Sequence, residues 1–111
     1  MNKSGAPIPL IHRDYRLISG GNVTLIVHSP AKFADGSDFT CEYEIRGLHS
    51  PVKRAAGGVD SIQCVLLALE MAAAALIASP EYRGRQLYWL NPDDPDLGLP
   101  LSKYGAEYGW Q

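Results

Sequence analysis

The chain has 111 residues, of which 46% are hydrophobic and 20% charged, which is the balance of one globular domain spanning residues 1–111. This composition excludes a disordered acidic tail, a collagen-like repeat and a coiled coil. The net charge of −2 predicts no basic surface for nucleic acid, so we expect no nucleic-acid partner.

The first third of the chain predicts a β-hairpin that follows a loose N-terminal arm at residues 1–9. Apolar and polar residues alternate on both sides of a Ser-Gly-Gly turn. A three-residue loop at 19–21 would pair Leu17 with Val23, so that the apolar side chains share one face. In this register His12 lies directly opposite His28.

The remaining pattern predicts an α+β fold: an antiparallel sheet of four or five strands with one long apolar helix packed on one face. Residues 39–46 alternate most clearly, with Cys41 and Tyr43 on the apolar side. The segment 91–111, rich in proline, aspartate and glycine, is expected to be irregular. The predicted strands are residues 10–18, 22–28, 39–46, 52–56 and 85–90.

The long helix is predicted over residues 60–79. Asp60 is a good N-cap, Gln63 completes a pattern like a capping box, and Pro80 ends the helix. The apolar run is short for a membrane span and contains Gln63 and Glu70, so we expect no membrane partner. The N-terminus has no apolar run typical of a secretory signal, so a cytoplasmic location is expected. The residues expected to pack on the sheet are Ile62, Val65, Leu66, Leu69, Ala73, Leu76 and Ile77.

The helix is apolar around its whole circumference, and such helices are normally buried. One small sheet covers only one side, so three interpretations of the other side stay open. A homodimer could cover it, the C-terminal residues Tyr104, Tyr108 and Trp110 could cover it, or its alanines could simply be exposed. The expected dimer interface consists of Ala68, Met71, Ala72 and Ala75.

The two cysteines, Cys41 and Cys64, lie in apolar stretches, where reduced cysteine behaves as a small hydrophobic residue. They are far apart in sequence and form no Cys-x-x-Cys motif, so we expect no zinc site and no cofactor.

Six polar residues are expected to share the sheet face that points away from the helix. A solvated face is the favoured interpretation, because a helix covers only one side of such a sheet. A partner-binding surface is the first alternative, and a metal or acid–base site the second. The residues are His12, Asp14, Arg16, His28, Glu42 and Glu44.

The residues of Cys41–Leu48, followed by Gly58–Gln63 and the leucine-rich helix, resemble a family of small bacterial proteins of unknown function. In that family a strand ending in Gly-Leu precedes a Gly-Val-Asp-Ser-Ile-Gln helix start. The resemblance covers residues 40–77 and implies a compact α+β domain, with no catalytic residues attached to it.

Three functions are compatible with these features. The favoured one is a non-enzymatic protein-binding module, for instance an immunity protein whose partner is a toxin. A small-ligand-binding or enzymatic domain is the second, and a subunit of a larger assembly the third. The second function would use an aromatic pocket formed by Tyr43, Tyr88, Trp89, Tyr104 and Trp110.

Overall fold

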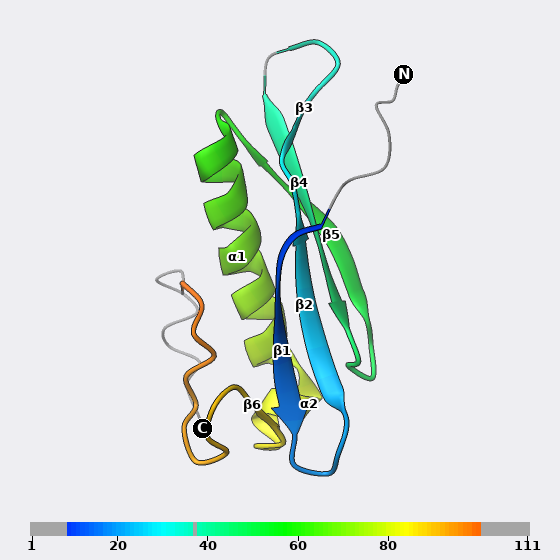
Figure 1. Cartoon of the computed structure of the whole chain (residues 1–111), viewed down its shortest axis with the longest axis vertical. Helices are drawn as coiled ribbons and strands as arrows, with labels where there is room; N and C mark the ends of the chain where they lie inside the picture. The colour runs from blue at the N-terminus through cyan, green and yellow to red at the C-terminus, as the bar shows by residue number, and fades with distance from the viewer. Residues whose placement is uncertain (1–8, 37, 101–111) are drawn as a thin grey trace.

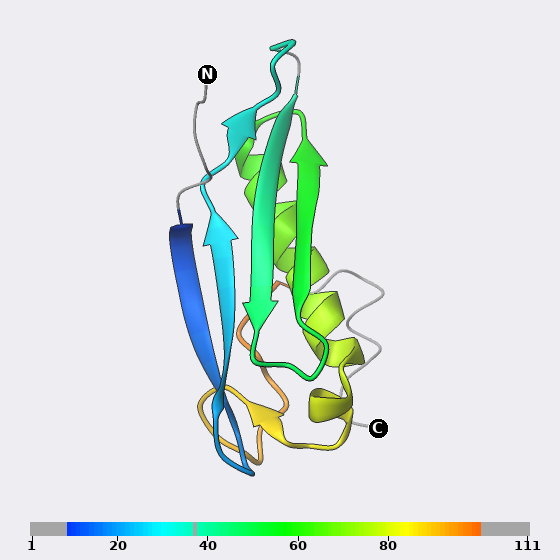
Figure 2. The same ribbon diagram turned by 90° about the vertical axis from the view of Figure 1, so that its right-hand side faces the viewer.

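A computed structural model describes residues 9–36 and 38–100 and confirms the predicted α+β architecture. One open antiparallel sheet carries the long helix α1 on one face, and the segment 91–100 lies on that same face (Figures 1 and 2). In chain order the elements are β1 (Pro9–Leu17), β2 (Asn22–His28), β3 (Ala31–Lys32), β4 (Phe39–Arg46), β5 (Val52–Gly58), α1 (Ser61–Ala78), α2 (Pro80–Arg83) and β6 (Leu87–Tyr88).

The sheet is centred on β4 and β2. β5 pairs along one side of β4, while β2 and the short β3 pair along the other side. β1 follows β2, and β6 pairs with β1 only at Arg16 and Leu17. The two-residue strand β3 and the helical turn α2 were not predicted, because such short elements show no periodicity.

The predicted hairpin register is wrong by two residues. Tyr15, and not Leu17, lies opposite Val23, and the loop consists of residues 18–20. Gly20 and Gly21 both have positive φ angles, +106° and +91°, which glycine adopts without strain, so the turn closes one residue earlier than expected. Because the shift is an even number of residues, the apolar side chains keep their face.

The sheet side of the core follows the predicted alternation. Tyr15, Tyr43 and Ile45 are completely or almost completely buried, whereas Leu17 at the end of β1 is only partly buried. The other core residues of the three long strands are Val23, Leu25, Val27 and Cys41.

The last turns of the helix pack as predicted, with Ala73, Leu76 and Ile77 buried, but its first half is rotated relative to the prediction. There the buried residues are small and spaced four apart, and Ile62 and Leu66, expected in the core, are 71% and 48% exposed. The physical reason is a close approach of backbones at the end of β5: a Cβ atom on Gly58 would lie 2.7 Å from the Cys64 nitrogen. Only small side chains fit into so narrow a space. The small residues of the buried stripe are Cys64, Ala68 and Ala72.

The predicted helix start is confirmed. The Gln63 N–H donates to Asp60 Oδ1 at 2.8 Å, and Gln63 Oε1 accepts from the Val59 N–H at 2.8 Å. Ser79 ends α1 and also begins α2, where its hydroxyl accepts from the Tyr82 N–H at 3.2 Å. Pro80 at the first turn of α2 therefore separates two helices and does not end helical structure altogether.

The segment 91–100 has no helix or strand and is fastened to the domain through its carbonyl groups. The Tyr15 hydroxyl donates to the Leu97 carbonyl at 2.8 Å, and the Tyr82 hydroxyl donates to the Pro95 carbonyl at 3.0 Å. Leu97 is itself buried in the core. Residues Tyr104, Tyr108 and Trp110, which were considered as a cover for the helix, lie outside the described residues.

Candidate functional sites

The outer sheet face carries the six predicted polar residues, but they differ in how far they are exposed to solvent. His12, Asp14 and Arg16 are exposed, whereas His28 is buried. The expected His12–His28 pair is wrong, because the hairpin register places His12 opposite Ile26.

His28 instead pairs with Glu44, whose carboxylate Oε2 lies 2.9 Å from His28 Nε2. Arg46, which the sequence interpretation did not include although it shares the parity of Glu44, reaches Glu44 Oε1 at 3.2 Å. The hydrogen bond from His28, assisted by Arg46, lowers the pKa of Glu44. His28 Nδ1, by contrast, is buried and has no hydrogen-bond partner among the described residues.

Two further polar residues of this face, Asp14 and Glu42, have different surroundings. Asp14 accepts a hydrogen bond from the Thr24 hydroxyl at 2.7 Å, and Glu42 is half-buried. Within residues 9–36 and 38–100, no three His, Cys, Asp or Glu side chains are grouped so that they could hold a metal ion.

Both cysteines are buried and reduced, as predicted. The Cys41 thiol donates to the His28 carbonyl at 3.2 Å, and the Cys64 thiol to the Ala56 carbonyl at 3.3 Å. Burial raises the pKa of Cys41 to about 11 and also raises the pKa of Cys64. Since the thiolate is the nucleophilic form, neither residue is prepared for catalysis.

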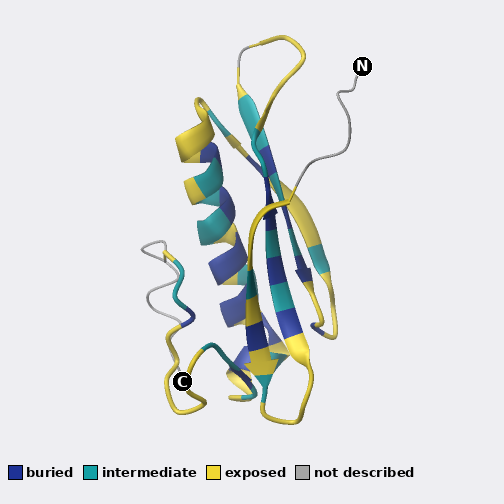
Figure 3. Ribbon diagram, viewed as in Figure 1, coloured by how far each residue is buried: buried dark blue, intermediate teal, exposed yellow. Residues whose placement is uncertain are grey.

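The rotation of α1 exposes large apolar side chains near its N-terminus. We name Val59, Ile62 and Leu66 the apolar patch; they are 68%, 71% and 48% exposed. Ile62 and Leu66 are four residues apart and lie on one side of the helix, and Val59 directly precedes the N-cap residue Asp60. Figure 3 shows the exposed surface of these first turns, while the opposite side is buried against the sheet.

The predicted dimer interface is corrected by the same rotation. Ala68 and Ala72 are fully buried inside the chain, so a second chain has no access to them. Met71 is 36% exposed and Ala75 is half-buried, so both lie partly at the surface.

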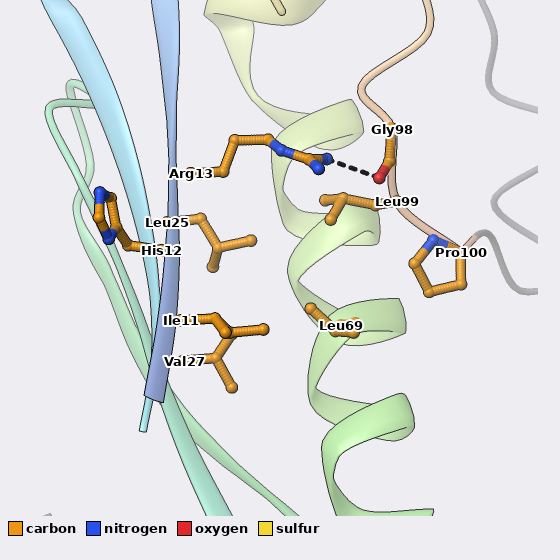
Figure 4. Close-up of a pocket in the computed structure, with 9 residues that line it drawn as sticks. All are labelled: Ile11, His12, Arg13, Leu25, Val27, Leu69, Gly98, Leu99 and Pro100. Carbon is orange, nitrogen blue, oxygen red and sulfur yellow. Dashed lines mark hydrogen bonds between the residues drawn. The ribbon is translucent and has the colours of Figure 1, made fainter. Parts of the chain in front are cut away.

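A pocket of about 310 Å³ lies between the sheet, α1 and the segment 98–100 (Figure 4). Most of its lining is aliphatic, and His12 points away from it on the other side of β1. The lining residues are Ile11, His12, Arg13, Leu25, Val27, Leu69, Gly98, Leu99 and Pro100.

The predicted aromatic pocket stays a prediction, because Tyr104 and Trp110 lie outside the described residues. Tyr43 is buried in the core, and Tyr88 and Trp89 do not line the cavity. The alternation of β1 could have indicated Ile11 and Arg13, which share the parity of Tyr15. No sequence pattern indicates that residues 98–100 form a wall of this pocket.

Arg13 is the one charged side chain in this pocket besides the outward-facing His12. Its Nη1 donates to the Leu97 carbonyl at 3.0 Å and to the Gly98 carbonyl at 2.6 Å. The guanidinium lies over the Trp89 ring, with 4.1 Å between its central carbon and the ring centroid. These contacts fix its position at one end of the cavity.

By length and composition alone, α1 could cross a membrane, and 33% of its residues are buried in the structure. The core helices of many soluble proteins pass the same test, and here one side of α1 packs on the sheet. The absence of a membrane partner stays a prediction.

The chain belongs to the family described as a domain of unknown function, DUF6968, whose model matches residues 11–101. This confirms the predicted relationship to a family of unknown function. No curated protein and no solved structure showed a significant match to the chain.

Proposed function

We propose that this member of the family is a non-enzymatic, cytoplasmic protein-binding module and that it pairs with a second copy of itself through the apolar patch of α1. The observation that carries this proposal is the exposure of three large apolar side chains at the start of α1, namely Val59 before the N-cap and Ile62 and Leu66 in the first turns. Grouped exposed apolar residues mark interaction surfaces more often than single ones do.

A second copy is the occupant that the chemistry of the patch fits best. Glu70 is the one charged residue between Ser61 and Ala78, so two copies of this helix would meet without strong repulsion. A two-fold axis lets one surface serve both partners, and it is the commonest symmetry of protein dimers. The reduced state of both cysteines agrees with a cytoplasmic location.

Light scattering during gel filtration tests the proposal. We expect a mass of about 24 kDa at micromolar concentration, twice the 12.1 kDa of one chain. Leu66→Glu places a charge in the centre of the patch and should give a mass near that of one chain, with the far-ultraviolet circular dichroism unchanged.

Ile18→Glu is the matched control, because Ile18 is also exposed, at 56%, but lies in the turn after β1. This variant should remain dimeric. A wild-type chain that is monomeric, or two variants with the same mass, would contradict the proposed interface. If the monomeric chain instead forms a stable complex with a co-expressed toxin, the second copy is the wrong partner.

A further inference from the structure

We propose that the pocket between β1, α1 and residues 98–100 binds a small amphipathic carboxylate, with its apolar body in the cavity and its carboxylate on Arg13. The sequence analysis considered a small-ligand pocket lined by aromatic residues, and the pocket proposed here has an aliphatic lining instead. It does not depend on the proposed dimer, because Val59, Ile62 and Leu66 do not line the pocket.

The shape and lining of the cavity suit an apolar body. About 310 Å³ is at the lower end of the ~300–1,000 Å³ that ligand pockets occupy. The walls come from three different parts of the chain and offer few polar groups, since His12 points away (Figure 4). The aliphatic and proline walls are Ile11, Leu25, Val27, Leu69, Leu99 and Pro100.

Arg13 supplies the charge that would select an anion. Its Nη1 donates to the carbonyl groups of Leu97 and Gly98, and its side chain also acts on the neighbouring Tyr15 hydroxyl. Among residues 9–36 and 38–100, no carboxylate forms an ion pair with Arg13. Asp96, close by in sequence, uses Oδ1 to accept from the Gly98 N–H at 2.8 Å. Within the described residues, the charge of Arg13 is therefore not neutralised by a carboxylate, and it lies beside an apolar cavity.

The guanidinium is also held in place before any ligand arrives. Its contact with the Trp89 ring and its two carbonyl partners restrict its rotation. A restrained arginine loses less conformational entropy when it binds a carboxylate, and the planar fork matches that group. We choose a carboxylate because an arginine fork can bind it through two parallel hydrogen bonds, and the apolar walls leave room for its hydrocarbon body.

Titrations followed by ¹⁵N–¹H NMR, with octanoate and 1-octanol as matched probes, test this inference. The two probes have the same chain length and differ in charge. We expect octanoate to shift the amide signals of Ile11, Leu69 and Leu99 and to bind at least about tenfold more tightly than 1-octanol. Arg13→Gln should reduce the affinity for octanoate to that for 1-octanol, while Arg13→Lys should retain part of the preference.

Arg16→Gln is the matched control, since it removes the same charge from the same strand but on the exposed outer face. It should leave both affinities unchanged. Leu69→Trp should fill the cavity and abolish binding of both probes. Absence of octanoate binding, equal affinities for the two probes, or a preference that survives Arg13→Gln in a folded protein would overturn the inference. None of these results depends on the mass of the protein in solution.

Discussion

Arg13 joins three separate parts of the chain through one side chain. It leaves β1, lies over Trp89 and donates to the carbonyls of Leu97 and Gly98. Gly98 has a φ angle of +67°, and an added Cβ would collide with the Trp89 ring and the Arg13 guanidinium. A glycine at this position is therefore required by both its backbone angle and its close packing.

The two thiols should be inert in the folded protein. Burial shields Cys41 and Cys64, and it raises the pKa of Cys41 to about 11, so very little thiolate exists at neutral pH. We expect no reaction with Ellman's reagent over minutes at pH 8, and two reactive thiols per chain in denaturant. Rapid labelling of either thiol without denaturant would contradict the buried position of that residue.

Glu44 should contribute stability that depends on pH. The hydrogen bond from His28, followed by Arg46, lowers the pKa of Glu44 in the folded state. The ionised form therefore favours folding, fully above about pH 5, and the benefit is lost as the pH falls below about 4. Glu44→Gln should lower the free energy of unfolding by about 1–2 kcal/mol at pH 6.

Urea denaturation at several pH values measures this difference. The two proteins should approach equal stability near pH 3. Glu42→Gln on the same strand is the control, since Glu42 forms no ion pair with any residue of 9–36 or 38–100, and it should change stability little at any pH. A constant difference between wild type and Glu44→Gln from pH 3 to pH 6 would show that the carboxylate charge is not involved.

At the scale of single elements, α1 shows why an apolar helix is difficult to orient from sequence. When nearly every position is apolar, periodicity marks no single face. The neighbouring strand β5 determines which side of the first turns faces the sheet. At its end, Gly58 allows the two backbones to approach closely, and the small residues Cys64, Ala68 and Ala72 fit there. Larger residues such as Leu66 are consequently turned outward.

Matched substitutions on the two sides of α1 test this orientation. Ala68→Leu adds volume between the helix and the sheet and should cost about 1–3 kcal/mol of stability. Ala74→Leu makes the same change on the exposed side and should stay within about 0.5 kcal/mol. Urea denaturation measures both, and equal effects would contradict the observed rotation.

The hairpin illustrates a second limit of sequence interpretation. Alternation in β1 and β2 determines which side chains share a face, and this part of the prediction is confirmed by the burial of Tyr15 and Val23. The pairing itself depends on which glycine angles close the turn, and a shift of two residues keeps the same face. The sequence therefore predicted the core but not the neighbours of His12.

For the whole molecule, regular elements could be predicted and the pocket could not. Strands and helix follow from alternation and capping, which are local properties. The pocket depends on residues 98–100, which lie in an irregular segment held by carbonyl groups that any residue possesses. No sequence pattern connects two residues 85 positions apart, such as Arg13 and Gly98, whose carbonyl accepts the hydrogen bond.

The same arrangement decides which apolar side chains are exposed around α1. One side of α1 packs on the sheet, and Leu97 of the segment 91–100 is buried in the same core. The first turns of the helix keep large apolar residues at the surface. On the outer sheet face, His28 and Glu44 form an ion pair. The first turns of α1 are the surface that the proposed dimer would use.

The most direct test measures how accessible the Ile62 methyl group is to a soluble paramagnetic agent in methyl NMR spectra. The account predicts that this signal is protected in the wild-type protein and strongly broadened in Leu66→Glu, while the Val23 methyl groups stay protected in both. An Ile62 signal broadened in the wild type would show that no second copy covers the patch. A signal protected in monomeric Leu66→Glu would show that the chain covers the patch itself.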